Sequence, residues 1–244
     1  MAVTYESSDG VAIITIDRAD KRNAINRQVC QGLSGAWQRF ARDDDKVAIL
    51  AAAGDQAFCA GADLKDFPGE IWQAVPNLGV PCDKPIIAAI GGYAVGAGCS
   101  LALYSDMVIA SETATFIYSE GSIGVFQGLM GGFPRKMPYG VGLEWTLTGE
   151  PMTARRAYEI GFVNKVCTPG QQLDVALDLA RTIASKAPLV VQELKSMALK
   201  TLPASPMDVF YPQKHRLDTI ANSDDAEEGR SAFAEKRPPN FKGA

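Results

Sequence analysis

Four short apolar runs constrain the fold of this 244-residue chain more than any other feature. They are Val11–Asp17, Val47–Ala53, Ile86–Ile90 and Met107–Ala110, and most are rich in β-branched side chains. Continuous rather than alternating apolar runs are typical of strands that are covered on both faces, as in parallel sheets flanked by helices. Between the first two runs, residues Asn26–Arg42 carry apolar side chains at helical spacing. The sequence therefore predicts an α/β fold.

The second half of the chain has helical periodicity instead. The shift occurs near residue 140, but no linker marks it, so we do not expect independent domains there. Residues Phe116–Gly132 lack regular periodicity and are rich in glycine, which predicts a loop with short turns. Helices are expected over Gly140–Thr148, Thr153–Ile160, Gln171–Lys186, Pro188–Leu202 and Met207–Ala221.

Composition excludes several classes of function. The net charge is −4, which gives no general attraction to nucleic acid or to an anionic membrane. No apolar run is long enough for a transmembrane helix, and the first residues do not resemble a secretory signal. A single histidine, His215, and cysteines without C-x-x-C spacing argue against a metal site and a Ser-His-Asp triad. We expect reduced thiols in the cytoplasm at Cys30, Cys59, Cys82, Cys99 and Cys167.

A glycine-rich stretch, Gly91–Gly98, lies between an expected strand and a short buried helix expected over Cys99–Tyr104. This order of elements places backbone N–H groups and a helix N-terminus before an anion or an oxyanion. A P-loop would need a Gly-Lys-Ser/Thr string, and a dinucleotide fingerprint would need glycine where Leu101 stands. A structural turn without any ligand-binding role is a further interpretation of this stretch. A second loop of small residues, Phe58–Lys65, favours a carbonyl oxygen held between two loops.

Five ordered segments span nearly the whole chain: ADKRNAIN (19–26), AFCAGADLKD (57–66), PIIAAIGGYAVGAGCSLAL (85–103), LTGEPMTARRAYEIGFVNKV (147–166) and EGRSAFAEKRPPNFKG (228–243). Together they resemble the crotonase (enoyl-CoA hydratase/isomerase) family. The resemblance implies a crotonase-like spiral of ββα units over residues 1–190. A C-terminal helical region over residues 191–244 would serve trimerisation and complete the CoA site, in a homotrimer or a dimer of trimers.

Carried over by position, the resemblance assigns the thioester oxygen to the backbone N–H groups of Ala62 and Ala97. The enzyme would act on an acyl-CoA in fatty acid metabolism through an enolate, with coenzyme A as part of the substrate and no separate cofactor. Phe233 and Lys236 would reach the CoA site from a neighbouring subunit. The other expected CoA contacts are Arg22, Ala24, Ala60, Asp63, Leu64 and Lys65.

The catalytic positions depart from the pattern of the two-carboxylate hydratases. Ser100 stands where those enzymes have their first Glu, whereas Glu120 occupies the second position. One carboxylate suffices for a 1,3-proton shift, as in the Δ3,Δ2-enoyl-CoA isomerases, and the Ser/Glu pair also resembles hydroxycinnamoyl-CoA hydratase-lyases. A non-catalytic acyl-CoA binding protein is a further alternative. Two interpretations remain for the aromatic residues of this region: they line an aromatic acyl pocket, or they occupy ordinary core positions. The residues are Trp72, Tyr93, Tyr118 and Phe126.

Two smaller expectations concern the same region. Cys99 at a helix start could be a reactive thiolate, but a small buried thiol is the more ordinary role for such a residue. The stretch from Asp66 to Pro85 is shorter than is usual in the family, which predicts an acyl pocket of altered shape.

Overall fold

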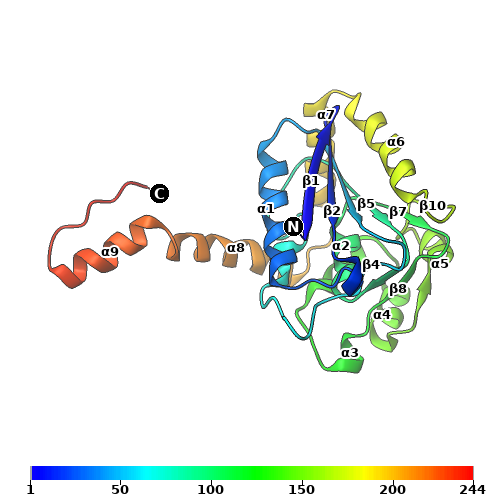
Figure 1. The fold of residues 1–244 in the computed structure, drawn as a ribbon, viewed down its shortest axis with the longest axis horizontal. Helices are drawn as coiled ribbons and strands as arrows, with labels where there is room; N and C mark the ends of the chain where they lie inside the picture. Colours follow the sequence, from blue (N-terminus) through cyan, green and yellow to red (C-terminus); the bar gives the residue numbers. More distant parts are fainter. Residues whose placement is uncertain (1, 244) are drawn as a thin grey trace.

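The structure is a computed structural model that describes residues 2–243, and it forms a compact body with a projecting helical arm (Figure 1). The larger sheet has six strands in the order β1-β2-β3-β5-β7-β10. Its first pair is antiparallel and the other neighbours are parallel, which confirms the predicted α/β fold. The strands are β1 (Val3–Ser8), β2 (Val11–Ile16), β3 (Val47–Ala52), β5 (Ile86–Ile90), β7 (Met107–Ser111) and β10 (Lys165–Cys167).

Helices cover both faces of this sheet, as the continuous apolar runs predicted. Ile49 and Ile87 pack in one cluster with α6 (Gln172–Ala184), whereas Leu50 lies in the cluster that includes the apolar side of α1 (Arg27–Arg42). Figure 1 shows these two helices on opposite sides of the strands. Successive residues of a strand point to opposite faces, so each central strand contributes to both cores.

A smaller sheet of four strands lies beside the larger one, in the order β4-β6-β8-β9. Its first three strands are parallel to one another, and the last is antiparallel to β8. These strands are β4 (Ala57–Cys59), β6 (Tyr93–Val95), β8 (Thr115–Ile117) and β9 (Met152–Thr153).

The predicted helices are confirmed to within a few residues, and Asn26, Thr153 and Ser223 accept N-capping hydrogen bonds from the backbone. The expectation of a loop over Phe116–Gly132 was only partly right, because this segment holds the end of β8, the short helix α3 and the start of η3. The remaining helices are η1 (Ala19–Lys21), η2 (Ile71–Ala74), α2 (Ala97–Tyr104), α3 (Glu120–Ile123), η3 (Leu129–Arg135), α4 (Tyr139–Thr148), α5 (Ala154–Glu159), α7 (Pro188–Thr201), α8 (Pro206–Ala221) and α9 (Asp224–Glu235).

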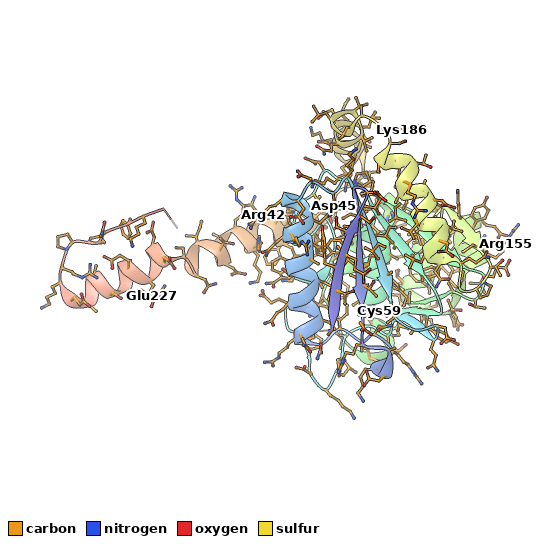
Figure 2. The ribbon with its side chains drawn as sticks, turned by 45° about the horizontal axis from the view of Figure 1, so that its top comes forward. Arg42, Asp45, Cys59, Arg155, Lys186 and Glu227 are labelled. Carbon is orange, nitrogen blue, oxygen red and sulfur yellow. The ribbon has the colours of Figure 1, made fainter. Side chains whose placement is uncertain are left out.

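Helices α8 and α9 extend away from the body as an arm (Figure 1). Figure 2 shows Glu227 far out on this arm, whereas Cys59 lies inside the body. Met1 and Ala244, the outer ends of the two expected regions, lie outside the described residues. Among residues 2–243, no helix has the length and apolar character to cross a bilayer.

Candidate active site

Three neighbouring parallel strands bring the predicted catalytic segments to one edge of the smaller sheet. The loop Ala60–Ala62 follows β4, the turn Gly96–Ala97 follows β6, and Tyr118–Glu120 follows β8. The carboxyl ends of parallel strands open toward the same side of a sheet, where ligands bind in α/β proteins. Segments up to 60 residues apart in sequence, from Ala60 to Glu120, thus meet at one place.

The first two loops approach each other at backbone distance. A methyl group built on Gly61 would lie 3.0 Å from the carbonyl oxygen of Val95 and 3.8 Å from the amide nitrogen of Ala97. A methyl group on Gly98 would lie 2.6 Å from the carbonyl oxygen of Cys59. Larger side chains at these two glycines would push the loops apart, so their small size is what allows the contact.

Within residues 2–243, neither the Ala62 amide nor the Ala97 amide donates a hydrogen bond outside the regular helix and strand pattern. An isolated bridge joins Ile25 to Ala62, but its hydrogen bonds use the Gly61 carbonyl and the Asp63 amide. Ala97 is the first residue of α2, and the first N–H groups of a helix have no partner within it. The Ala97 backbone is also not among the residues with positive φ, so a residue with a side chain fits this position without backbone strain.

The Glu120 carboxyl group lies against the start of α2. A methyl group on Gly96 would stand 2.7 Å from Glu120 Oε1, and the Gly96 backbone has φ +52°, which favours glycine. Burial raises the pKa of Glu120 from 4.5 to about 7, while the backbone amides of Glu120 and Ser119 partly oppose this rise. Such a carboxyl group can both accept and donate a proton near neutral pH.

A cavity of about 250 Å³ opens beside these groups, and both loops and Glu120 line it. Most of its other walls are apolar, including Phe67 and Ile71 from the shortened stretch after Asp66. Ser100 also belongs to the lining, but its Oγ atom is sealed from solvent and has no hydrogen-bond partner among the described residues.

The four candidates for an aromatic pocket differ in burial and in whether they line the cavity. Tyr118 lines the cavity and is 6% exposed, whereas Trp72 is a core residue stacked on Tyr211. The core alternative is wrong for Tyr93 and for Phe126, because both are largely exposed, and neither lines this cavity. Of the four candidates, Tyr118 is therefore the one that lines the cavity, where Phe67 is a second aromatic residue.

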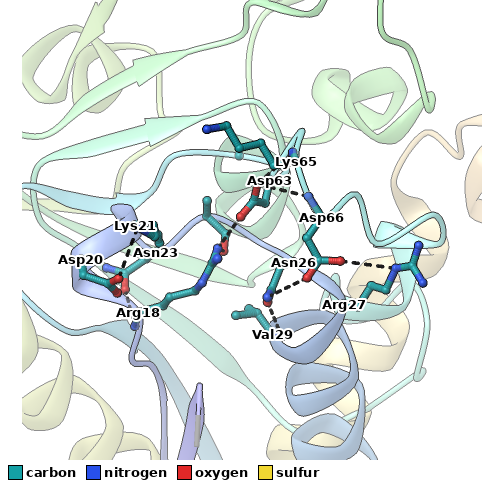
Figure 3. A network of polar contacts seen from close by, with 12 residues as sticks. Arg18, Asp20, Lys21, Asn23, Asn26, Arg27, Val29, Asp63, Lys65 and Asp66 are labelled. Carbon is teal, nitrogen blue, oxygen red and sulfur yellow. Dashed lines mark hydrogen bonds and ion pairs between the residues drawn. The ribbon is translucent and has the colours of Figure 1, made fainter.

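An ion pair that the sequence did not reveal holds the first loop. Arg18 Nη1 donates to Asp63 Oδ2 at 2.7 Å and to the Ala24 carbonyl at 3.1 Å, as Figure 3 shows for the network. Asp63 also accepts from the Lys65 amide, and the bond to Arg18 leads the causes that lower its pKa. Asp63 therefore stabilises the loop next to Ala62 through its bonds to Arg18 and Lys65, in addition to any contact with a ligand.

Three of the expected CoA contacts, Arg22, Ala60 and Leu64, line the cavity or a neighbouring surface hollow. The exposed Arg22 lines a surface hollow of about 550 Å³ together with Ala60 and Val95, which also line the cavity. No ion pair engages Arg22 or Lys65 within residues 2–243. Leu64 is largely exposed at the cavity wall, and the Ala24 carbonyl takes part in the Arg18 network.

Phe233 and Lys236 do not join this site within one chain. Phe233 lies on α9 and is 88% exposed, and Lys236 is the exposed residue that ends the helix. The arm carries both away from the body (Figure 1).

The remaining reactive residues have ordinary surroundings. Cys99 is buried, and burial raises the pKa of its thiol well above the usual value, which confirms the buried thiol and contradicts a thiolate. His215 is partly exposed on α8, where its ring meets the edge of Trp72. No cluster of three or more potential metal-binding side chains occurs in the part of the chain that the structure describes.

Comparisons with known proteins agree with this architecture. The model of the enoyl-CoA hydratase/isomerase family matches residues 6–244. The chain is 37% identical over 261 residues to (E)-benzylidenesuccinyl-CoA hydratase from Thauera aromatica, covering 100% of both chains. It is 36% identical to carnitinyl-CoA dehydratase from Proteus mirabilis, covering 94% of each. The crystal structure of carnitinyl-CoA hydratase from Mycobacterium avium superposes with TM-score 0.75 at 38% identity, covering 100% of this chain and 99% of that one.

Proposed function

The chain belongs to the enoyl-CoA hydratase/isomerase family, and from this premise we propose that it adds water reversibly to a 2-enoyl-CoA thioester with Glu120 as the only acid/base. The observation that carries the proposal is the meeting of the Ala62 and Ala97 loops beside a buried carboxyl group whose pKa is about 7. The similar proteins named above are a hydratase and a dehydratase of CoA thioesters, which supports the same reaction type.

The chemistry follows from the positions of these groups. Ionised Glu120 takes a proton from water, and the water oxygen bonds to C3 of the enoyl group. The electron pair of the double bond moves toward the thioester, so negative charge gathers on the carbonyl oxygen. The Ala62 and Ala97 N–H groups donate to this oxygen, and each such donor is worth roughly 10²–10³ in rate. Glu120 then returns its proton to C2, which completes the addition of one water molecule.

We expect a neutral acyl group of moderate size. Glu120 is the only charged residue among those that line the cavity within residues 2–243, so a charged tail would find no counter-ion beyond the catalytic group. The cavity volume of about 250 Å³ equals that of roughly eight water molecules, at about 30 Å³ each. An acyl chain of about eight non-hydrogen atoms would therefore fill the cavity.

The CoA part of the substrate would lie outside the cavity, along the hollow at Arg22. The walls that the hollow and the cavity share give a continuous path from the phosphates to the thioester. Lys65, Leu64, Ala24, Ala60 and the backbone near Asp63 would complete this surface.

A second copy of the chain would supply Phe233 and Lys236. The exposed apolar side chains on the arm and on α7 need a partner surface, since patches of this kind mark interfaces. We therefore propose a homotrimer or a dimer of trimers, in the cytoplasm. These side chains include Leu189, Leu194, Val209, Phe210, Leu217 and Ile220.

Double-bond isomerisation is the second candidate, because Ser100 replaces one of the two carboxylates of the typical hydratases. Glu120 alone could move a proton from C2 of a 3-enoyl thioester to C4. Aldehyde release from a hydroxycinnamoyl thioester is a further reaction of a Ser/Glu pair. Purified protein offered crotonyl-CoA, 3-hexenoyl-CoA and feruloyl-CoA distinguishes these reactions by their products.

The test of the proposal is Glu120→Gln, which keeps the shape of the side chain and removes its proton transfer. We expect the hydration rate to fall by roughly 10²–10⁴ while CoA binding persists. Glu150→Gln, at an exposed position outside the cavity, is the matched control and should change neither. An unchanged hydration rate in Glu120→Gln would remove Glu120 from its role. If the parent protein binds CoA but turns over none of the three thioesters, a non-catalytic binding protein would be favoured instead.

A further inference from the structure

The hydroxyl group of Tyr118 is a buried donor without a protein partner. The side chain lines the cavity and is 6% exposed, and its ring centroid lies 6.3 Å from that of Trp145. Its hydroxyl makes no hydrogen bond with the described residues, yet it is not among the polar atoms that are sealed from solvent. Buried tyrosine hydroxyls usually find a partner, so this one is expected to bond to what occupies the cavity.

Tyr118 lies close to the acid/base group. Both residues follow β8 and are separated only by Ser119. Burial raises the pKa of Tyr118 most, and the charge of Glu120 raises it further, so the phenol stays protonated across the neutral range in which Glu120 ionises. A protonated phenol is a constant hydrogen-bond donor beside the carboxylate.

Hydration needs such a donor. An attacking water has to be held by more than its base, because one contact leaves the direction of its lone pairs undefined. Ser100 stands in the position of the missing carboxylate and belongs to the cavity lining, but its Oγ atom is buried from solvent in this structure, as is Glu120 Oε2. Tyr118 and Ser119 both line the cavity beside Glu120, and neither hydroxyl bonds to a described residue. Of the two, the phenol of Tyr118 is the more acidic group and the stronger hydrogen-bond donor.

We propose that Tyr118 is a catalytic residue whose hydroxyl donates a hydrogen bond to the water that Glu120 deprotonates, an assignment that rests on the proposed function. The water oxygen accepts from Tyr118, gives one proton to Glu120 and attacks C3 with a lone pair. Tyr118 keeps its own proton throughout. Its hydrogen bond also stabilises the negative charge that develops on the water oxygen as the proton leaves.

The test compares two reactions of the same site in Tyr118→Phe. Hydration of crotonyl-CoA needs the attacking water, whereas exchange of the C2 protons of butyryl-CoA in D₂O needs only Glu120 and the two amides. We expect kcat for hydration to fall about 10- to 100-fold, the equivalent of one hydrogen bond to a charged group. The exchange rate should stay within about twofold, since no transition-state contact of that reaction is lost.

Controls separate this proposal from the function on which it rests. Tyr158→Phe, at an exposed position on α5, should leave both reactions unchanged, and Glu120→Gln should lower both. Unchanged hydration in Tyr118→Phe, or an equal fall of both reactions, would overturn the role of Tyr118 alone. Unchanged rates in Glu120→Gln would instead refute the proposed function. The exchange rate itself shows whether Tyr118→Phe still folds its site.

Discussion

Replacing Glu120 by Gln is expected to stabilise the folded protein at neutral and alkaline pH, although it removes the proposed acid/base. The pKa of this carboxyl group is about 7 in the folded protein, against a reference value of 4.5. Below the lower value both states are protonated and the carboxyl group costs nothing. As the pH rises from 4.5 to about 7 the unfolded chain loses its proton first, so stability falls, and above about 7 the loss is complete.

The magnitude follows from the size of this shift. A rise from 4.5 to about 7 corresponds to roughly 3 kcal/mol at most. The carboxyl group borders a cavity that water can enter, and screening reduces the cost to about 1–2 kcal/mol. An amide of the same shape pays no such cost, so the variant should gain this amount over the parent protein.

Urea unfolding on either side of the pH window measures the effect. The free energies of unfolding of Glu120→Gln and of the parent protein should be compared at about pH 5 and about pH 8.5, at equal protomer concentration. The difference between them should be small at the acid end and reach its full value at the alkaline end. Glu150→Gln serves as the exposed control. An advantage that is equal at both pH values, or larger at acid pH, would refute burial as the cause.

Three further changes test the surroundings of Glu120 by steady-state kinetics. Gly96→Ala should lower kcat by more than about 100-fold, because its methyl group would meet Glu120 Oε1 and its backbone needs positive φ; near-normal kcat would contradict the observed packing. Arg18→Met should free Asp63 and lower kcat roughly 10-fold through the displaced Ala62 amide, and an unchanged kcat would show that the loop holds without the ion pair. Arg22→Ala should raise KM for crotonyl-CoA about tenfold with little change in kcat, and less so at high salt; a KM that does not change would place the phosphates elsewhere.

The sequence predicted the fold where an element carries its own pattern. The strands β2, β3, β5 and β7 have continuous apolar runs, and the amphipathic period of α1 indicated its bounds to within one residue. The strands of the smaller sheet are only two or three residues long, and hydrogen bonding to neighbours rather than local composition defines them. No periodicity is measurable over three residues, which is why Phe116–Gly132 was expected to be a loop.

The candidate site could be predicted in part for a similar reason. Small residues after two strands indicated the Ala62 and Ala97 loops, because close approach of two backbones requires them. The Arg18–Asp63 ion pair joins residues 45 positions apart, and no local pattern marks such a pair. The free hydroxyl of Tyr118 and the sealed hydroxyl of Ser100 depend on side-chain packing, which only coordinates reveal.

One physical cause links the acid/base and the oxyanion-binding amides. Burial beside the apolar cavity walls raises the pKa of Glu120 toward neutrality, and the same low-dielectric surroundings would strengthen the bonds from the two amides to the charged thioester oxygen. A carboxylate in open water would remain ionised and would return its proton to C2 poorly, whereas two amides in open water would bond to solvent. A single carboxyl group with a pKa near the working pH can serve in both proton transfers. In the proposed mechanism, burial at the edge of the smaller sheet would thus let one Glu serve in both proton transfers, for which the two-carboxylate hydratases have two Glu residues.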